Sequence, residues 1–227
     1  MPGPSQQREL PDLAPLINQA LLDPHLDQEV LQQTCDAARH FGFAGVCTNL
    51  NRLQAARERL GPPGPTRLIA VIAFPFGAIP STLKQAEAEW AADHGAEELD
   101  VVPDFWALSQ GKAELFAEEL AEICALGLPV NVILNMARLP ADSLSLAVDA
   151  AIDADVSGLQ SGNGFGPAVT AADIRLLANL ARGRCGIKAA GGLHTLEQAL
   201  DMVEAGATRL GTSQGPALMQ ALRRGQT

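Results

Sequence analysis

The sequence predicts a single-domain α/β protein folded as a (β/α)8 TIM barrel, and three observations support this fold class. Strand-like and helix-like segments alternate along the chain with a repeat of roughly 25 to 30 residues, as in the βα units of a parallel sheet. Eight strand-like segments can be counted, which is the number that closes such a barrel. The length of 227 residues also suits one barrel. An open doubly wound sheet is the alternative, but no GxGxxG follows an early strand and neither GxxxxGKS nor GxxxxGKT occurs, so its nucleotide-binding forms lose support.

The predicted strands are short apolar runs bounded by turn-forming residues. In chain order they cover 19–22, 44–48, 67–74, 98–102, 130–135, 158–161, 186–189 and 208–211.

The predicted helices carry start and stop signals. The first has apolar residues at i, i+3 and i+4 and ends at Gly42, because glycine readily adopts the left-handed conformation that closes a helix. Thr170 and Thr195 each lie three residues before a side chain that can complete a capping box. The helical segments are 27–41, 81–94, 136–154, which contains an amphipathic run, 170–180 and 195–204.

The composition limits which domain organisation and which classes of function are expected. We expect a polar leader over 1–15 and the barrel over 16–227. No apolar run reaches the roughly 18 residues of a membrane span and the N-terminus has no secretory segment, so we expect a cytoplasmic protein that does not bind membranes. A formal net charge of −10 argues against nucleic-acid binding. The four cysteines lack CxxC spacing, so we expect reduced core residues and no metal site.

The central feature of the sequence is Lys188, which lies within the apolar strand of RCGIKAAGGLHT. A buried amine loses hydration, which lowers its pKa and makes a neutral nucleophile available. The alternative is that Lys188 leaves the barrel mouth to pair with a carboxylate. Asp100, in ELDVV, is costly to bury without a cation, so we expect it to form a salt bridge or proton relay with Lys188; a structural capping role is the alternative.

The C-terminal ends of the barrel strands share one face, so polar side chains at these ends predict the lining of a pocket. They are Asn18, Gln19, Cys47, Asn49, Asp100, Asn131, Asn135, Gln160 and Lys188.

Two glycine-containing turns predict a phosphate site. Gly191 and Gly192 follow the seventh strand, whereas Gly211 and Ser213 belong to GTSQG, which opens the last helix. Backbone N–H groups at such turns, supported by a helix dipole, suit a phosphate dianion, and barrels often place this site after strands seven and eight. A purely structural origin of both turns is the alternative.

The segments GFAGVCTN, VIAFPFGA, EELDVV, GNGFG, GIKAAGG and EAGATRLGTSQG, in this order and across nearly the whole chain, resemble the deoxyribose-phosphate aldolases. The resemblance implies a (β/α)8 barrel that cleaves 2-deoxyribose 5-phosphate to acetaldehyde and glyceraldehyde 3-phosphate. It implies a lysine imine as the electron sink, with no metal or cofactor, and a homodimer as one expected assembly. Carried over by motif, Asp100 is the proton-relay acid and Lys188 lowers the pKa of a neighbouring lysine. The implied phosphate cradle is Gly191, Gly192, Gly211 and Ser213, and the polar lining adds Asn18, Cys47 and Asn135.

The chain departs from the family at the Schiff-base lysine. The family's strand-six motif reads approximately FVKTSTGF, whereas the matching stretch is GLQSGNGF, with Gln160 at the lysine position. An amide nitrogen is delocalised into its carbonyl group and cannot form an imine. Without a second lysine and facing Asp100, Lys188 should have a raised pKa. The other lysines, Lys84 and Lys112, are expected on the outside, which leaves Lys188 as the one credible imine former.

The other substitutions replace charged groups by neutral amides. They remove acid, base and nucleophile functions while they keep hydrogen-bonding capacity. INQALLD stands where the family has IDHTLLK, and NVILNM stands where it has KVIIET, so the changed positions include Asn18, Gln19, Asp23, Asn131 and Asn135.

Three functions follow from these observations. The first is a non-catalytic aldolase homologue that binds a phosphorylated sugar or aldehyde, or a protein partner. The second is an active aldolase-like lyase that forms its imine on Lys188 and uses Asp100 for proton transfer. The third is an assembly protein without a ligand. His194 stands where the family commonly has arginine, which weakens phosphate affinity because a neutral imidazole offers no fixed charge.

Overall fold

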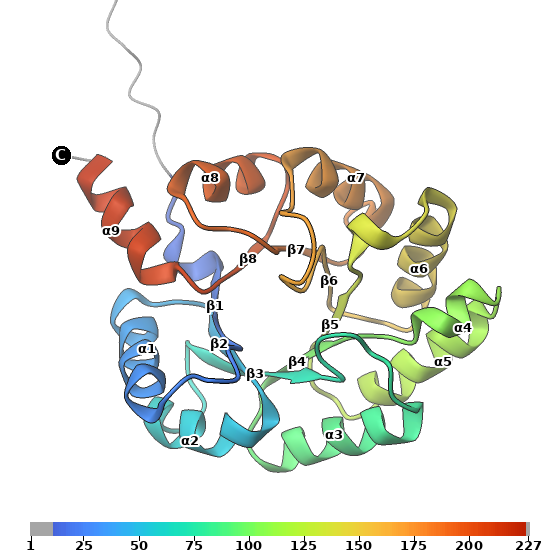
Figure 1. Ribbon diagram of the computed structural model, residues 1–227, viewed down its shortest axis with the longest axis horizontal. Coiled ribbons are helices and arrows are strands. Elements are labelled where there is room, and N and C mark those ends of the chain that lie inside the picture. Colours follow the sequence, from blue (N-terminus) through green and yellow to red (C-terminus); the bar gives the residue numbers. More distant parts are fainter. Residues whose placement is uncertain (1–10, 226–227) are drawn as a thin grey trace, which may run out of the picture.

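The computed structural model describes residues 11–225 and forms a closed barrel of eight parallel strands in sequential order, surrounded by helices (Figure 1). The predicted fold class is therefore confirmed, and the doubly wound alternative is wrong because β1 pairs with β8 and leaves no open edge. The strands are β1 Ile17–Leu21, β2 Gly45–Thr48, β3 Arg67–Ile72, β4 Glu98–Val101, β5 Val130–Ile133, β6 Gly158–Gln160, β7 Gly186–Ala190 and β8 Arg209–Thr212.

The helices form the outer layer of the barrel and cover the strands on all sides (Figure 1). Their apolar faces pack on the outward-facing side chains of the strands, and together these residues form the main hydrophobic core. The helices are α1 Gln28–Phe41, α2 Leu50–Leu60, α3 Ser81–Asp93, α4 Phe105–Ser109, α5 Ala113–Cys124, α6 Ala141–Asp153, α7 Ala171–Ala181, α8 Leu196–Glu204 and α9 Gly215–Gly225, with 3-10 turns at Ala14–Leu16 and Met136–Arg138. None of the helices within residues 11–225 is long and apolar enough to cross a membrane.

The predicted helix signals are present in the structure. Gly42 ends α1 in the left-handed conformation, with φ of 74°. Thr170 and Thr195 each accept a hydrogen bond from the third backbone amide of their helix, and the side chains of Asp173 and Gln198 complete the two capping boxes. These local bonds fix where α7 and α8 begin, and hence where the loops that precede them run.

The structure differs from the sequence-based assignment in several places, which include strand bounds, since β1 begins at Ile17 and β3 ends at Ile72. Helices α2, α4 and α5 were not assigned, and Pro140 divides the predicted segment 136–154 into a 3-10 turn and α6. Residues 1–10 of the predicted leader lie outside the described residues. The end of the leader belongs to the packed core, because Leu13 is fully buried there.

Glycines inside the barrel make room for long side chains from neighbouring strands. A Cβ atom on Gly158 would lie 2.4 Å from Oδ1 of Asn131, which is too close for any side chain. A Cβ atom on Gly211 would lie 2.8 Å from Cβ of Ala190 and 3.4 Å from Cε of Lys188. The barrel interior can therefore hold a polar side chain as large as lysine.

The expectation that Lys84 lies on the outside is wrong. Its side chain is fully buried between α3 and α5, where its ammonium forms an ion pair of 2.9 Å with Glu119. Glu119 also accepts hydrogen bonds from the Ser81 hydroxyl and from the Asp104 amide, at 2.6 and 2.9 Å. Lys84 is thus a structural cation, held away from the barrel mouth.

Candidate functional site

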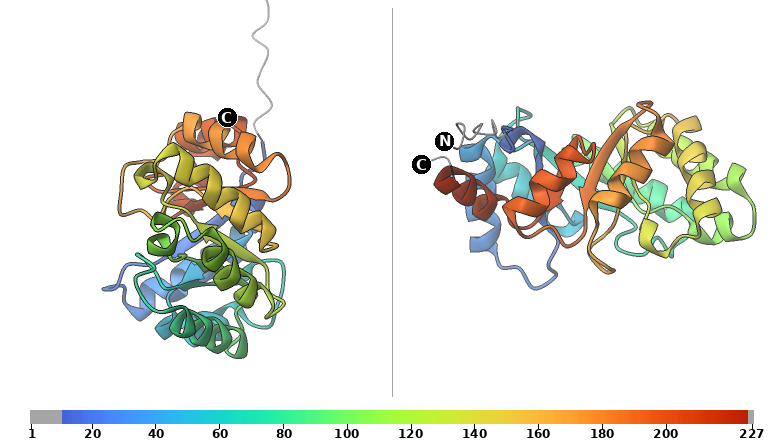
Figure 2. Two further views of the ribbon diagram at one scale, coloured as in Figure 1. Left: turned by 90° about the vertical axis from the view of Figure 1, so that its right-hand side faces the viewer. Right: turned by 90° about the horizontal axis from the view of Figure 1, so that it is seen from above.

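A cavity of about 780 Å³ opens at the C-terminal ends of the strands. Loops 22–27 and 162–170 project from this end of the barrel (Figure 2), and residues of both loops contribute to the wall of the cavity. Among the residues predicted to line a pocket, those that reach it are Asn18, Gln19, Cys47, Asp100, Gln160, Lys188, Gly191, Gly192, Gly211 and Ser213.

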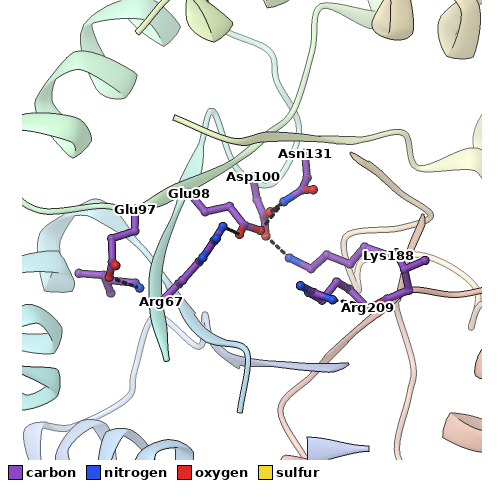
Figure 3. Close-up of polar contacts among 9 residues, drawn as sticks. Arg67, Glu97, Glu98, Asp100, Asn131, Lys188 and Arg209 are labelled. Carbon is purple, nitrogen blue, oxygen red and sulfur yellow. Dashed lines mark hydrogen bonds and ion pairs between the residues drawn. The ribbon is translucent and has the colours of Figure 1, made fainter. Parts of the chain in front are cut away.

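Lys188 and Asp100 form a buried ion pair inside the barrel (Figure 3). The two side chains are 3% and 2% exposed, so the pair is almost completely removed from water. Asp100 also accepts hydrogen bonds from the Cys47 thiol at 3.3 Å and from Nδ2 of Asn131 at 3.0 Å. Lys188 therefore stays in the barrel, where a buried carboxylate with three donors holds its ammonium.

The charge of this pair follows from its surroundings. Burial, the largest single influence, lowers the pKa of the Lys188 ammonium, but Asp100, Cys47 and Glu98 together outweigh it and raise that pKa above the ordinary value. Burial, together with repulsion by Asp100, raises the pKa of the Cys47 thiol well above its usual range. A raised pKa is the shift expected for a lysine that faces Asp100. At neutral pH the amine is protonated and the thiol is neutral, so neither group is a ready nucleophile.

A row of polar contacts continues from this pair toward the N-terminal ends of the strands. Nδ2 of Asn131 donates to Oε1 of Glu98 at 2.6 Å, and Oε2 of Glu98 lies 3.5 Å from the half-exposed guanidinium of Arg67 (Figure 3). Asn131 thus points into the barrel between two carboxylates. It does not line the cavity as the sequence-based prediction had it.

Gln160 lies beside Lys188, since these two residues are register partners in the β6–β7 ladder. Its Nε2 atom donates to the carbonyl oxygen of Gly162 at 2.7 Å, and the side chain is 6% exposed. Because a carbonyl oxygen can only accept, this bond fixes the orientation of the amide. The Oε1 atom of Gln160 is buried and has no hydrogen-bond partner among residues 11–225.

Asn18, on β1, provides a second buried amide among the residues that line the same cavity. It pairs with Gly211 in the β1–β8 ladder, it is 2% exposed, and its Nδ2 atom is without a partner in the described part of the chain. Asn135 is placed differently. It adopts a left-handed conformation just after β5 and faces a smaller neighbouring pocket with Ser161 and Gly162.

The two glycine turns are only partly available to an anion. The amide of Gln214 donates to the Thr212 hydroxyl, and the amide of Gly215 donates to Oε1 of Gln19, each at 2.9 Å. Nε2 of Gln19 in turn donates to the carbonyl oxygen of Ser213 at 2.9 Å, so this side chain holds the β8–α9 turn in place.

At the turn after β7, Oε1 of Gln198 accepts hydrogen bonds from the amides of His194 and Thr195. The Gly191–Gly192 turn packs against the β6–α7 loop, where a Cβ atom on Gly192 would lie 2.7 Å from Cβ of Ala168. Of the four residues of the predicted phosphate cradle, Gly191, Gly192 and Ser213 therefore remain candidates. Gly211 lies within β8, and the contacts around it give it a packing role beneath Lys188.

The charges that line the cavity are few. Of the described residues in its wall, Lys188 alone carries a full positive charge and is already paired with Asp100, whereas Asp23 adds a further negative charge. No group of three or more His, Cys, Asp or Glu side chains that could hold a metal is found within residues 11–225. The site is thus a polar pocket without an uncommitted cation.

An aromatic rim at the cavity mouth was not predicted from the sequence. The Phe74 and Phe165 rings meet edge to face with centroids 5.9 Å apart, and both line the cavity. Nδ2 of Asn163 donates to the carbonyl oxygen of Pro75 at 2.7 Å and joins the two loops that carry the rings. The motifs FPFGA and GNGFG contain these residues, but only the folded chain brings them together.

Similarity to known proteins extends over nearly the whole chain. No protein-family model matches it. A deoxyribose-phosphate aldolase of Cyanothece sp. is 44% identical over 210 residues, which cover 92% of each chain. Among solved structures, the aldolase QR15 is 32% identical with a TM-score of 0.89, covering 95% of this chain and 98% of that one. A deoxyribose phosphate aldolase from Aeropyrum pernix, described as tetrameric, is 30% identical with a TM-score of 0.84, covering 93% and 91%.

Proposed function

The chain belongs to the deoxyribose-phosphate aldolase family, and from this premise we propose that it binds a phosphorylated sugar or aldehyde without imine chemistry. The observation that carries the proposal is Gln160. It lies beside Lys188, where the family resemblance places the Schiff-base lysine, and its nitrogen is an amide that donates to Gly162. An amide nitrogen has no available lone pair, so the covalent step cannot occur there.

Lys188 is a poor substitute for the lost nucleophile. Imine formation needs a neutral amine, and the ion pair with Asp100 raises the pKa of the Lys188 ammonium instead of lowering it. To attack a carbonyl carbon, Lys188 would have to give up a proton and break a buried ion pair that has little access to water. This cost supports a binding role over turnover.

The phosphate group of the ligand is proposed to lie at Gly191, Gly192 and Ser213. These residues line the cavity beside the N-terminal ends of α8 and α9, whose helix dipoles favour an anion. The amides of His194, Thr195, Gln214 and Gly215 already donate to side chains, so the proposed donors are the amides of the glycine turn and the Ser213 hydroxyl. With no uncommitted cation in the described wall, this site relies on neutral donors.

The test combines calorimetric titration of 2-deoxyribose 5-phosphate with an assay for acetaldehyde release. We expect saturable binding without acetaldehyde. Ser213→Glu places a negative charge in the proposed cradle and should abolish binding, whereas Ser109→Glu, at an exposed serine on α4, should not. Acetaldehyde released in proportion to enzyme, or binding that survives Ser213→Glu, would overturn the proposal.

The second candidate function is an active aldolase-like lyase that forms its imine on Lys188. It is favoured by one observation, which is that Lys188 lines the cavity beside Gln160. In that case reduction in the presence of an aldehyde would attach the aldehyde to the Lys188 peptide, and Lys188→Ala would abolish both adduct and turnover.

We also propose self-association of the chain, with a homodimer as the first expectation. The support comes from the relative in Aeropyrum pernix, which is described as a tetramer. Light scattering after size-exclusion chromatography would show a mass that is a multiple of 23.8 kDa, and a mass of 23.8 kDa at micromolar concentration would contradict it. A protein partner in place of a small ligand stays a prediction from the sequence.

A further inference from the structure

The mouth of the cavity carries apolar side chains that are open to water. Phe165 is 54% exposed, and the centroid of its ring lies 5.9 Å from that of Phe74 and 5.8 Å from that of Phe76. Phe165, Phe74 and Leu22 line the cavity, and the last two pack on the same small apolar cluster inside the barrel. Apolar and aromatic side chains exposed in a concave surface are typical of ligand sites. This rim therefore offers an apolar contact to a bound molecule.

The backbone of Phe165 is held on both sides of the ring. Its amide donates to Oδ1 of Asn163 at 2.9 Å, and its carbonyl oxygen accepts from Nη2 of Arg138 at 2.8 Å. Asn163 is anchored in turn, because its Nδ2 atom donates to the carbonyl oxygen of Pro75 at 2.7 Å. The exposed ring thus does not belong to a free loop tip. A contact surface that is already ordered loses less entropy when a ligand binds.

The rim adjoins the proposed phosphate site. A Cβ atom on Gly191 would lie 3.7 Å from the amide nitrogen of Gly164, the residue that precedes Phe165. Further along the same loop, the amide of Val169 donates to the carbonyl oxygen of Gly191 at 2.9 Å. The loop that carries Phe165 therefore packs against the glycine turn, and both line one cavity. A single molecule can contact the glycine turn and the ring together.

The size and the charge of the cavity favour such a molecule over a bare sugar phosphate. Its volume of about 780 Å³ lies in the upper part of the range of about 300–1,000 Å³ that is typical of pockets for drug-sized ligands. A five-carbon sugar phosphate is smaller than such ligands and would leave part of this space unfilled. The described wall has no uncommitted cation, so burial of an apolar group would supply affinity that charge does not.

We propose that the ligand is a phosphorylated molecule that also carries an apolar ring, and that this ring lies against Phe165 and Phe74. The inference rests on the proposed function, since it takes the phosphate site at Gly191, Gly192 and Ser213 as given. Phe165 is then the residue that decides which phosphorylated molecule is preferred. A pentose phosphate alone would fill only the polar part of the cavity.

The test compares two probes by calorimetric titration. Phenyl 2-deoxyriboside 5-phosphate and methyl 2-deoxyriboside 5-phosphate of the same anomeric configuration carry the same charge and differ only in the group on C1. We expect the phenyl probe to bind about tenfold more tightly, a factor in the range of one buried aromatic contact. In Phe165→Ala this preference should fall to about twofold or less, because the ring that it depends on is gone. 2-Deoxyribose 5-phosphate is titrated as the reference.

Two further variants make the comparison specific. Phe165→Leu keeps an apolar side chain and should retain part of the preference for the phenyl probe. Trp106→Ala removes a ring that is 69% exposed on α4 and lies outside the cavity wall, so it should leave the preference unchanged. The thermal unfolding midpoint of each variant without ligand checks that it folds. Light scattering shows whether Phe165→Ala alters the assembly of the chain.

The outcomes separate the two proposals. If 2-deoxyribose 5-phosphate binds but the phenyl probe has no advantage over the methyl probe, or keeps its advantage in Phe165→Ala, the inference is wrong and the binding function stands. If none of the three compounds binds the unmodified chain, the proposed function fails and the inference fails with it. A change of assembly mass in Phe165→Ala would assign the rings to a contact between copies of the chain and overturn the inference. A preference that Phe165→Ala removes and Trp106→Ala keeps would support both proposals.

Discussion

Replacing Asp100 by asparagine removes the carboxylate that holds Lys188 and leaves the ammonium buried. The Lys188 side chain is only 3% exposed, so water cannot take the place of the lost charge. Breaking a buried ion pair by removal of one partner typically costs about 3–5 kcal/mol, because the remaining charge is uncompensated. Asp100→Asn keeps the shape of the side chain, and so isolates the charge.

The cost of this change has an upper limit, because the lysine can lose its proton in the folded variant. Each pH unit below the ordinary lysine pKa of about 10.4 costs about 1.36 kcal/mol, so deprotonation costs about 4.6 kcal/mol at pH 7 and about 2 kcal/mol at pH 9. In the variant the folded-state pKa of Lys188 lies below its unfolded value. The unfolded chain then binds more protons, and the free energy of unfolding rises with pH relative to the unmodified chain.

The assay is urea unfolding of both chains at pH 7 and pH 9. We expect Asp100→Asn to lower the free energy of unfolding by about 3–4.6 kcal/mol at pH 7 and by no more than about 2 kcal/mol at pH 9. In the double variant Asp100→Asn/Lys188→Met, the loss of free energy of unfolding relative to the unmodified chain should no longer differ between pH 7 and pH 9. Asp149→Asn, which breaks an exposed pair with Arg184, should cost at most about 1 kcal/mol at either pH.

A small loss that is the same at pH 7 and pH 9 would refute this reasoning. It would mean that Lys188 is already neutral in the folded chain, as a nucleophilic lysine would be. The proposal that the ion pair disables Lys188 would then be wrong.

Three other predictions concern the scaffold and its titration. Glu119→Gln leaves the fully buried Lys84 ammonium without its carboxylate and should lower the free energy of unfolding by about 3–5 kcal/mol in urea. Gly158→Ala places a Cβ atom 2.4 Å from Oδ1 of Asn131 and should cost about 1–3 kcal/mol in the same assay, since a buried amide has to move. Burial, and to a lesser extent Asp36, raises the pKa of the Cys35 thiol from 9.0 to about 11, so the unfolded chain releases this proton first. Thermal stability should therefore fall as pH rises from about 9 toward 11, and less steeply in Cys35→Ala.

Matched variants control these predictions. Glu118 is exposed on the same helix as Glu119, so Glu118→Gln should leave the free energy of unfolding within about 0.5 kcal/mol. Gly64→Ala places its Cβ atom 3.7 Å from the nearest contact, an ordinary distance, and should be nearly neutral. If Glu119→Gln lowers the free energy of unfolding as little as Glu118→Gln does, the structural role of the Lys84–Glu119 pair is contradicted. If Cys35→Ala loses as much thermal stability between about pH 9 and 11 as the unmodified chain does, groups other than Cys35 cause the loss.

The fold was predictable because its signals are local and repeat along the chain. The capping residues Thr170 and Thr195 and the terminal Gly42 act on helices within a few residues of themselves, so their meaning can be read without a tertiary structure. Eight repeats of strand and helix then leave few arrangements other than a closed barrel. The proximity of Lys188 to Asp100 and Gln160 followed from this arrangement.

The parts that could not be predicted depend on partners distant in the sequence. Lys84 was assigned to the surface because a helical lysine usually lies there, but Glu119, 35 residues later, provides a buried counter-charge. Gln19 was expected to face a ligand, and the turn that its amide holds is 194 residues away. Asn131 is the register partner of Asp100 in the β4–β5 ladder, and its hydrogen bond to Glu98 holds it below the cavity. In each case a hydrogen-bond partner, and not local pattern, decides where the side chain points.

The most direct test of the central claim is reductive trapping with sodium borohydride in the presence of acetaldehyde or 2-deoxyribose 5-phosphate, followed by intact-protein and peptide mass spectrometry. Gln160→Lys is treated in parallel, because it restores an amine beside Lys188 and returns the like charge that lowers the pKa of both. We predict no mass increment on the Lys188 peptide of the unmodified chain, and an increment at position 160 in the variant. An increment on Lys188 of the unmodified chain would contradict the account and make the protein an aldolase with a relocated imine.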